Sequence, residues 1–143
     1  MRLALPLVAV ALLASGCAST APSTVDFSAR AAALAQDALI VDTHIDVPYR
    51  LADTPDDVSV RTATGDFDHP RAIAGGLDVA FMSIYIPASY QETGGARALA
   101  DSLIDMVEGI AEAAPAKFAV VRSVDDVARL RQPGRVLLAL GME

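Results

Sequence analysis

Residues 38–46 have the sequence Ala38-Leu39-Ile40-Val41-Asp42-Thr43-His44-Ile45-Asp46, an apolar run that ends in a His-x-Asp motif. The run predicts a buried strand over Leu39 to Asp46, and side chains two residues apart in a strand project from the same face. We therefore expect His44 and Asp46 to lie together at the end of this strand. An imidazole and a carboxylate at that spacing suit one divalent metal, and zinc is the usual metal for mixed nitrogen and oxygen ligands.

A second apolar run leads to a carboxylate at the far end of the sequence. Val136 to Leu140 predicts a strand, and Glu143 follows it closely. Between the two runs, strand patterns alternate with helix patterns. The predicted strands are Asp78 to Ile86 and Phe118 to Val121; the predicted helices are Ser28 to Asp37, a turn over Arg71 to Leu77, Ala96 to Ala114 and a short segment capped by Ser123, with a long polar loop over Asp53 to Asp68.

This alternation predicts a parallel α/β sheet. The strands are near-continuous apolar runs, as expected when helices cover both faces. In a (β/α)8 barrel the functional residues lie at the carboxyl ends of the strands, which is where the sequence puts His44, Asp46 and Glu143. We expect residues 28–143 to form the N-terminal half of a TIM-type (β/α)8 barrel, truncated at its C-terminus, because four strands do not close such a barrel. A smaller open sheet is the alternative.

Charge and cysteine content narrow the functional classes. The chain of 143 residues has a net charge of −7, and Lys117 is its only lysine. This acidic balance, without a basic patch, argues against nucleic acid as a partner. Cys17 is the only cysteine, so an internal disulfide is excluded. An oligomer is compatible with the sequence, which does not determine the oligomeric state.

The first residues have the pattern of a targeting segment. Arg2 precedes an apolar stretch from Leu3 to Leu13, which is too short to span a bilayer as a helix. The following Ala14-Ser15-Gly16-Cys17 resembles the lipobox of bacterial lipoproteins. The resemblance implies a signal peptide over 1–16, a lipid on Cys17, a tether over 17–27, and anchoring to the bacterial membrane, facing the periplasm, with Ala18 favouring the outer membrane. An ordinary secretory signal with an incidental cysteine is the alternative.

Three stretches resemble one enzyme family. Residues 41–48, Val41-Asp42-Thr43-His44-Ile45-Asp46-Val47-Pro48, resemble the first-strand motif of the membrane (renal) dipeptidases. Residues 71–76, Arg71-Ala72-Ile73-Ala74-Gly75-Gly76, and the strand after them are similar to the family's next conserved stretch. Residues 138–143, Leu138-Ala139-Leu140-Gly141-Met142-Glu143, resemble the start of a third motif. The three matches fall in the family's order.

The resemblance implies a (β/α)8 barrel with a two-zinc centre that hydrolyses dipeptides, often with a D-residue at the C-terminal position. His44 and Asp46 would bind the first zinc, and Glu143 would bridge both. Water activated by the metals would attack the peptide carbonyl, and no side chain would act as a catalytic residue. The family's remaining zinc and substrate ligands come from later strands. We therefore expect a polypeptide of residues 17–143 to be inactive and poorly folded.

Alternatives remain for individual residues and for the function. Asp42 shares a face with His44 and either orients its ring or accepts backbone hydrogen bonds. Tyr49 and Arg50 follow the motif and are interpreted as packing and surface charge rather than as substrate contacts. His69 is interpreted as a solvated loop histidine. Another amidohydrolase-type metal hydrolase is disfavoured because that group usually has His-x-His on its first strand, and a non-enzymatic ligand-binding lipoprotein stays open.

Overall fold

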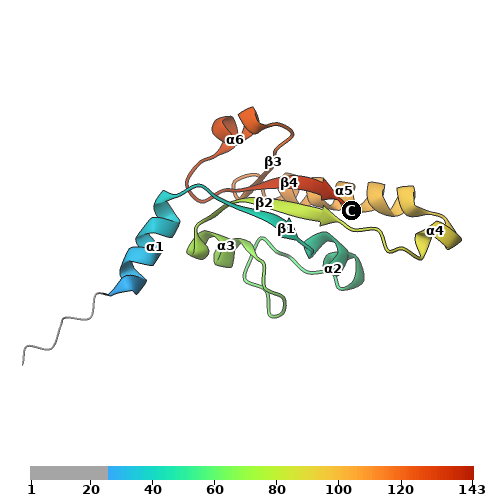
Figure 1. The fold of residues 1–143 in the computed structure, drawn as a ribbon, viewed down its shortest axis with the longest axis horizontal. Helices are drawn as coiled ribbons and strands as arrows, with labels where there is room; N and C mark the ends of the chain where they lie inside the picture. Colours follow the sequence, from blue (N-terminus) through green and yellow to red (C-terminus); the bar gives the residue numbers. More distant parts are fainter. Residues whose placement is uncertain (1–25) are drawn as a thin grey trace, which may run out of the picture.

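The computed structural model describes residues 26–143 (Figure 1). Cys17, the predicted signal peptide and most of the predicted tether lie outside the described residues. The helices are α1 (Phe27–Asp37), α2 (Val47–Asp53), α3 (His69–Gly75), α4 (Tyr90–Thr93), α5 (Ala96–Ala113) and α6 (Val124–Leu130), and the strands are β1 (Ile40–Ile45), β2 (Leu77–Ile84), β3 (Phe118–Val120) and β4 (Val136–Met142). Among residues 26–143, no helix combines the length and apolarity needed to cross a bilayer.

The strands form one parallel sheet in the order β1-β2-β4-β3. Chain order would put β3 between β2 and β4, but β4 lies directly beside β2. Their register runs without a break from the pair Val79–Leu137 to the pair Ile84–Met142. β3 has only 3 residues and occupies the edge of the sheet. The carboxyl end of β4 is therefore separated from that of β1 by a single strand.

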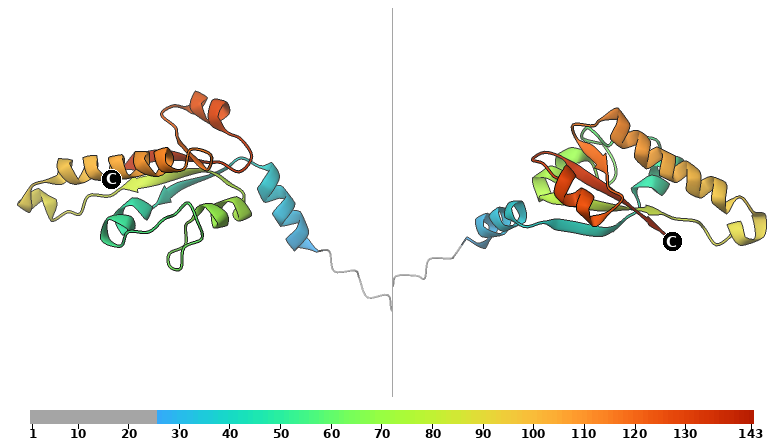
Figure 2. Two further views of the ribbon diagram at one scale, coloured as in Figure 1. Left: turned by 180° about the vertical axis from the view of Figure 1, so that it is seen from behind. Right: turned by 90° about the horizontal axis from the view of Figure 1, so that it is seen from above.

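Helices α2, α3 and α5 pack against one face of the sheet. Ala80, Met82 and Ile84 of β2 belong to the same buried cluster as Leu103 and Val107 of α5. α5 has the predicted apolar face, and both of these side chains are 0% exposed. Helices α2 and α3 lie on the opposite side of the sheet from α6 (Figures 1 and 2).

The other sheet face is apolar and less fully covered. Val79, Leu137 and Ala139 form a second buried cluster, against which Val127 and Leu130 of α6 pack. An open groove of 1260 Å³ runs along this face. In a (β/α)8 barrel the sheet face opposite the outer helices lines the interior, whereas here α6 packs against that face.

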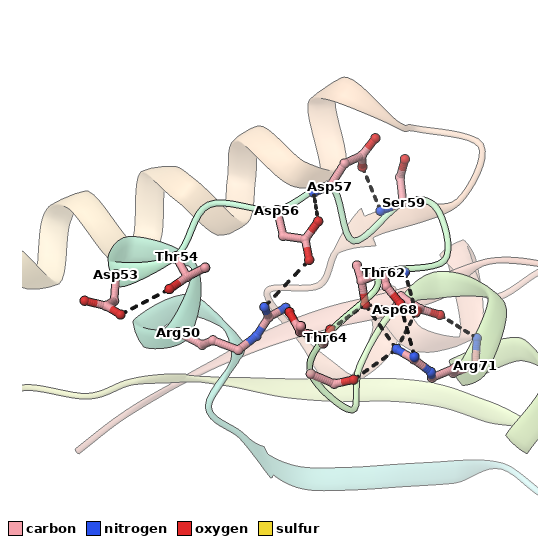
Figure 3. A network of polar contacts seen from close by, with 11 residues as sticks. Arg50, Asp53, Thr54, Asp56, Asp57, Ser59, Thr62, Thr64, Asp68 and Arg71 are labelled. Atoms are coloured by element: carbon pink, nitrogen blue, oxygen red, sulfur yellow. Dashed lines mark hydrogen bonds and ion pairs between the residues drawn. The ribbon is translucent and has the colours of Figure 1, made fainter.

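A buried carboxylate organises the polar loop that the sequence predicts (Figure 3). Asp68 is 0% exposed and accepts hydrogen bonds from Thr62 N at 2.9 Å, Arg71 N at 2.8 Å and Arg71 Nη1 at 2.6 Å. Burial raises the pKa of Asp68, but these hydrogen bonds and the Arg71 charge outweigh it, and the net pKa is lowered. Because Asp68 also caps α3, the helix begins at His69, two residues before the predicted turn.

Asp126 in α6 is expected to titrate at an unusually low pH. The side chain of Arg129 and the backbone amide of Arg122 donate hydrogen bonds to its carboxylate and lower its pKa from 3.8 to about 2. Because its pKa is lowered, the ionised Asp126 carboxylate stabilises the fold at pH values above its ordinary pKa. This contribution to stability is lost as the pH falls from about 4 to about 2. We expect an NMR titration of the Asp126 carboxyl to show this low midpoint and Arg129→Ala to raise it. A midpoint at the ordinary value in the parent would contradict the contact.

Candidate metal centre

The first two candidate ligands meet at the carboxyl end of β1. The strand ends at Ile45, and Asp46 occupies the N-cap position of α2. Its side chain forms no capping hydrogen bond. Instead, Asp46 Oδ1 lies 3.2 Å from His44 Nε2. The predicted juxtaposition of His44 and Asp46 is therefore present, although Asp46 lies one residue beyond the strand.

The third candidate, Glu143, is held beside β2. Its backbone N–H donates to Ile84 O at 3.4 Å, and its carbonyl accepts from Ile86 N at 3.2 Å, so the parallel pairing of β4 with β2 continues through it. Its Oε1 lies 3.3 Å from His44 Nε2. The same oxygen accepts a hydrogen bond from the Ser83 hydroxyl of β2. Two strand ends thus bring their side chains to one point on the rim of the sheet.

The three side chains fit a divalent metal in number, chemistry and spacing. One atom from each of His44, Asp46 and Glu143 lies within 4.8 Å of the others. Around a tetrahedral zinc with bonds of about 2.0–2.1 Å, neighbouring ligand atoms are about 3.3–3.4 Å apart. The 3.2 and 3.3 Å separations from His44 Nε2 match that spacing. Two carboxylates balance the charge of a divalent ion, and all three residues are exposed and open to a ligand.

The candidate metal centre is separate from the apolar groove. The groove is lined by residues such as Val41, Phe81 and Ala139, and none of the three candidate ligands contributes to it. The position at the carboxyl ends of parallel strands is the one at which (β/α)8 barrels place their functional residues.

Other residues near the motif have structural contacts. Asp42 Oδ1 accepts a hydrogen bond from the backbone N of His44 at 3.0 Å, which is the second of the two roles left open for it. The ring of Tyr49 packs edge-on against Tyr85 with centroids 5.2 Å apart. Arg50 Nη1 lies 3.9 Å from Asp56 Oδ2 (Figure 3). Arg50 thus faces the polar loop.

The interpretation of His69 as a solvated loop residue is wrong. His69 is the first residue of α3 and is only partly exposed. Its ring packs edge-on against Phe118, and its Nε2 is 2.8 Å from the carbonyl oxygen of Gly134. Asp68 caps the helix at this position, and the His69 ring lies against Phe118. Of the two histidines in the chain, His44 lies beside carboxylates at the strand ends and His69 does not.

Ser83 is the functional candidate that the sequence analysis missed. It is 4% exposed and lies on β2, opposite Gly141 of β4. A serine inside the apolar run of residues 78–86 is a detectable signal, because a buried hydroxyl needs a hydrogen-bond partner. The partner, Glu143, lies 60 residues away, and the sequence does not indicate that the two strands are adjacent.

Comparison with known proteins identifies the family. The family model of the membrane dipeptidases, peptidase family M19, matches residues 28–143. The chain belongs to this family of metallopeptidases. A comparison with curated proteins gave no significant match.

Solved structures agree with the fold. The chain is similar to a metallopeptidase from Rhodobacter sphaeroides, crystallised with a phosphinate mimic of the dipeptide L-Ala-D-Ala, at 22% identity and a TM-score of 0.62. It is also similar to dipeptidase AC of family M19, at 25% identity and a TM-score of 0.62. Each match covers 73% of this chain, and the chain spans only 38% and 35% of the two structures. The α/β architecture with a parallel sheet is thus that of the N-terminal part of an M19 barrel.

Proposed function

We propose that the intact protein is a zinc-dependent dipeptidase. The observation that carries the proposal is the meeting of His44, Asp46 and Glu143 at the carboxyl ends of β1 and β4, within a chain of family M19. A divalent metal held there would supply Lewis acidity and lower the pKa of a coordinated water to about 7.

Each of the three side chains would have its own role in binding the metals. His44 would offer the lone pair of Nε2 to a metal, which requires the neutral ring with its proton on Nδ1. Asp46 supplies the second donor and one negative charge. The contacts of Glu143 to His44 and Ser83 both use Oε1. Oε2 makes neither of these contacts. We propose that Glu143 would be the carboxylate shared by two zinc ions, as the resemblance implies.

We propose dipeptides as the substrates, including those with a D-residue at the C-terminus. The support is family membership together with the dipeptide mimic bound by the Rhodobacter sphaeroides metallopeptidase. The open position of the candidate ligands, all three exposed, leaves room for a peptide carbonyl beside them.

The test is hydrolysis of L-Ala-D-Ala and L-Ala-L-Ala by the intact protein. We expect turnover that is lost on treatment with a chelator and restored by zinc. The variant His44→Ala should not be restored by zinc. Hydrolysis that persists after complete removal of metal would contradict the proposal, and so would a protein that binds zinc at this site without cleaving any dipeptide.

A polypeptide of residues 17–143 alone is expected to be inactive. Residues 26–143 contribute His44, Asp46 and Glu143, and the resemblance implies that the remaining zinc ligands come from later strands. The second metal would therefore have Glu143 as its one ligand from this part of the chain. The prediction is checked by a dipeptidase assay on purified 17–143 with added zinc, run beside the intact protein. Turnover by 17–143 at a rate comparable to that of the intact protein would contradict it.

We also propose that the protein is exported and anchored through a lipid on Cys17. The support is the sequence pattern of residues 1–17, in which a single cysteine follows small residues and an apolar stretch. Mass spectrometry of the N-terminal peptide checks this, with a diacylated cysteine as the expected first residue.

A further inference from the structure

The Ser83 hydroxyl lies where it can control a candidate metal ligand. Ser83 projects from β2 on the same sheet face as Val79, which belongs to the cluster of the less covered face. It is 4% exposed and donates a hydrogen bond to Glu143 Oε1. The direction of the bond is fixed, because an ionised carboxylate only accepts.

Glu143 needs such a constraint to present one geometry. Its side chain is 43% exposed, and a long, flexible side chain of this kind loses rotamer freedom when it is held in place. The main chain of Glu143 is already fixed by hydrogen bonds to Ile84 and Ile86. The Ser83 hydroxyl fixes the other end, at the oxygen that lies 3.3 Å from His44 Nε2.

We propose that Ser83 is a positioning residue for the metal centre, a role that rests on the proposed function. By donating to Oε1, Ser83 sets the rotation of the Glu143 carboxylate before a metal binds. One lone pair of Oε1 is taken by the hydroxyl, and the other acceptor positions of the carboxylate would remain for a metal. Hydrogen bonds to ligating carboxylates commonly have this effect, and their loss costs about 10–100-fold in metal affinity.

A purely structural role for Ser83 predicts different behaviour. A buried hydroxyl paired only to satisfy its own hydrogen-bonding requirement would contribute to folding stability, and removing it would leave metal affinity unchanged. Metal binding therefore separates the two roles, and catalytic activity is not needed as a readout.

The test measures zinc affinity of the intact protein by equilibrium dialysis and coordination by the visible spectrum of the Co²⁺ form. Ser83→Ala removes the donor, and Ser83→Thr keeps a hydroxyl on a β-branched residue suited to a strand. Ser102→Ala is the matched control, because Ser102 is exposed on α5 and its hydroxyl donates to Leu99 O at 2.7 Å within its own helix. His44→Ala serves as the reference for loss of a ligand.

We expect Ser83→Ala to bind zinc about 10–100-fold more weakly and to change the Co²⁺ spectrum. Ser83→Thr should stay close to the parent, and Ser102→Ala should be indistinguishable from it. Parent affinity in Ser83→Ala, with binding abolished in His44→Ala, would overturn the role of Ser83 and leave the proposed function intact. Absence of zinc binding by the folded parent protein would instead overturn both.

Discussion

Replacing His44 with alanine is expected to weaken zinc binding more than about 100-fold. Loss of a hydrogen bond that supports a metal ligand costs up to about 100-fold, and the loss of a ligand should cost more. The substitution removes a ligand itself. The Nε2 atom of His44 lies 3.2 Å from the carboxylate of Asp46 and 3.3 Å from that of Glu143. Without it, Asp46 and Glu143 present only like charges, which repel each other when no metal lies between them. Equilibrium dialysis with zinc on the parent and the variant measures the effect.

His69→Ala is the matched control for this experiment. His69 is the other histidine of the chain, and its ring contacts Phe118 and Gly134 rather than the strand ends. We expect His69→Ala to keep the zinc affinity of the parent. Equal zinc affinity in His44→Ala and the parent would favour a non-enzymatic ligand-binding lipoprotein over a metallopeptidase.

Replacing Asp68 with alanine is expected to lower the free energy of unfolding by about 3 kcal/mol. The side chain is 0% exposed and accepts hydrogen bonds from Thr62 N and Arg71 N, which would lose their partner inside the structure. The Arg71 guanidinium would also lose its counter-ion at 2.6 Å. Denaturant titrations of the parent and Asp68→Ala measure the difference.

Asp66→Ala controls for the loss of an acidic residue from the same loop, because Asp66 is exposed. Its effect should stay within about 0.5 kcal/mol. Because the pKa of Asp68 is lowered, its carboxylate contributes to folding stability at pH values above its ordinary pKa of 3.8. This contribution is lost as the pH falls below that value. Asp68→Ala should therefore lose less stability on acidification than the parent does. Equal stability of Asp68→Ala and Asp66→Ala at neutral pH would contradict the account of the loop.

Local patterns in the sequence predicted the helices well. The apolar spacing over Ala96 to Ala114 predicted α5 to within one residue of its end, because burial of one helix face leaves a periodic pattern. Gly76 ends α3 with a φ of 79°, and a Cβ there would lie 2.2 Å from Ala35 O, so this position requires glycine. Ser123 caps α6 through Asp126 N as expected. The helices α2 and α4 were missed, although Pro48 in the first turn of α2 was a signal for that helix.

The candidate site was predictable only in part. The spacing of His44 and Asp46 is a local property, so the sequence alone indicated that they meet. The approach of Glu143 depends on β4 lying beside β2, and this pairing depends on contacts between distant residues. The Ser83 hydrogen bond was missed for the same reason, because it joins two strands. The Asp68 network is local, and it was missed because it fixes a loop that has no periodic pattern.

Anomalous diffraction from a crystal of the zinc-loaded intact protein would locate the metal itself. We expect a zinc peak within about 2.0–2.2 Å of His44 Nε2, an Asp46 carboxylate oxygen and a Glu143 carboxylate oxygen. We also expect this peak to disappear in His44→Ala. A fully loaded protein with no anomalous peak at these three side chains, or with zinc bound only elsewhere, would contradict the proposed metal centre.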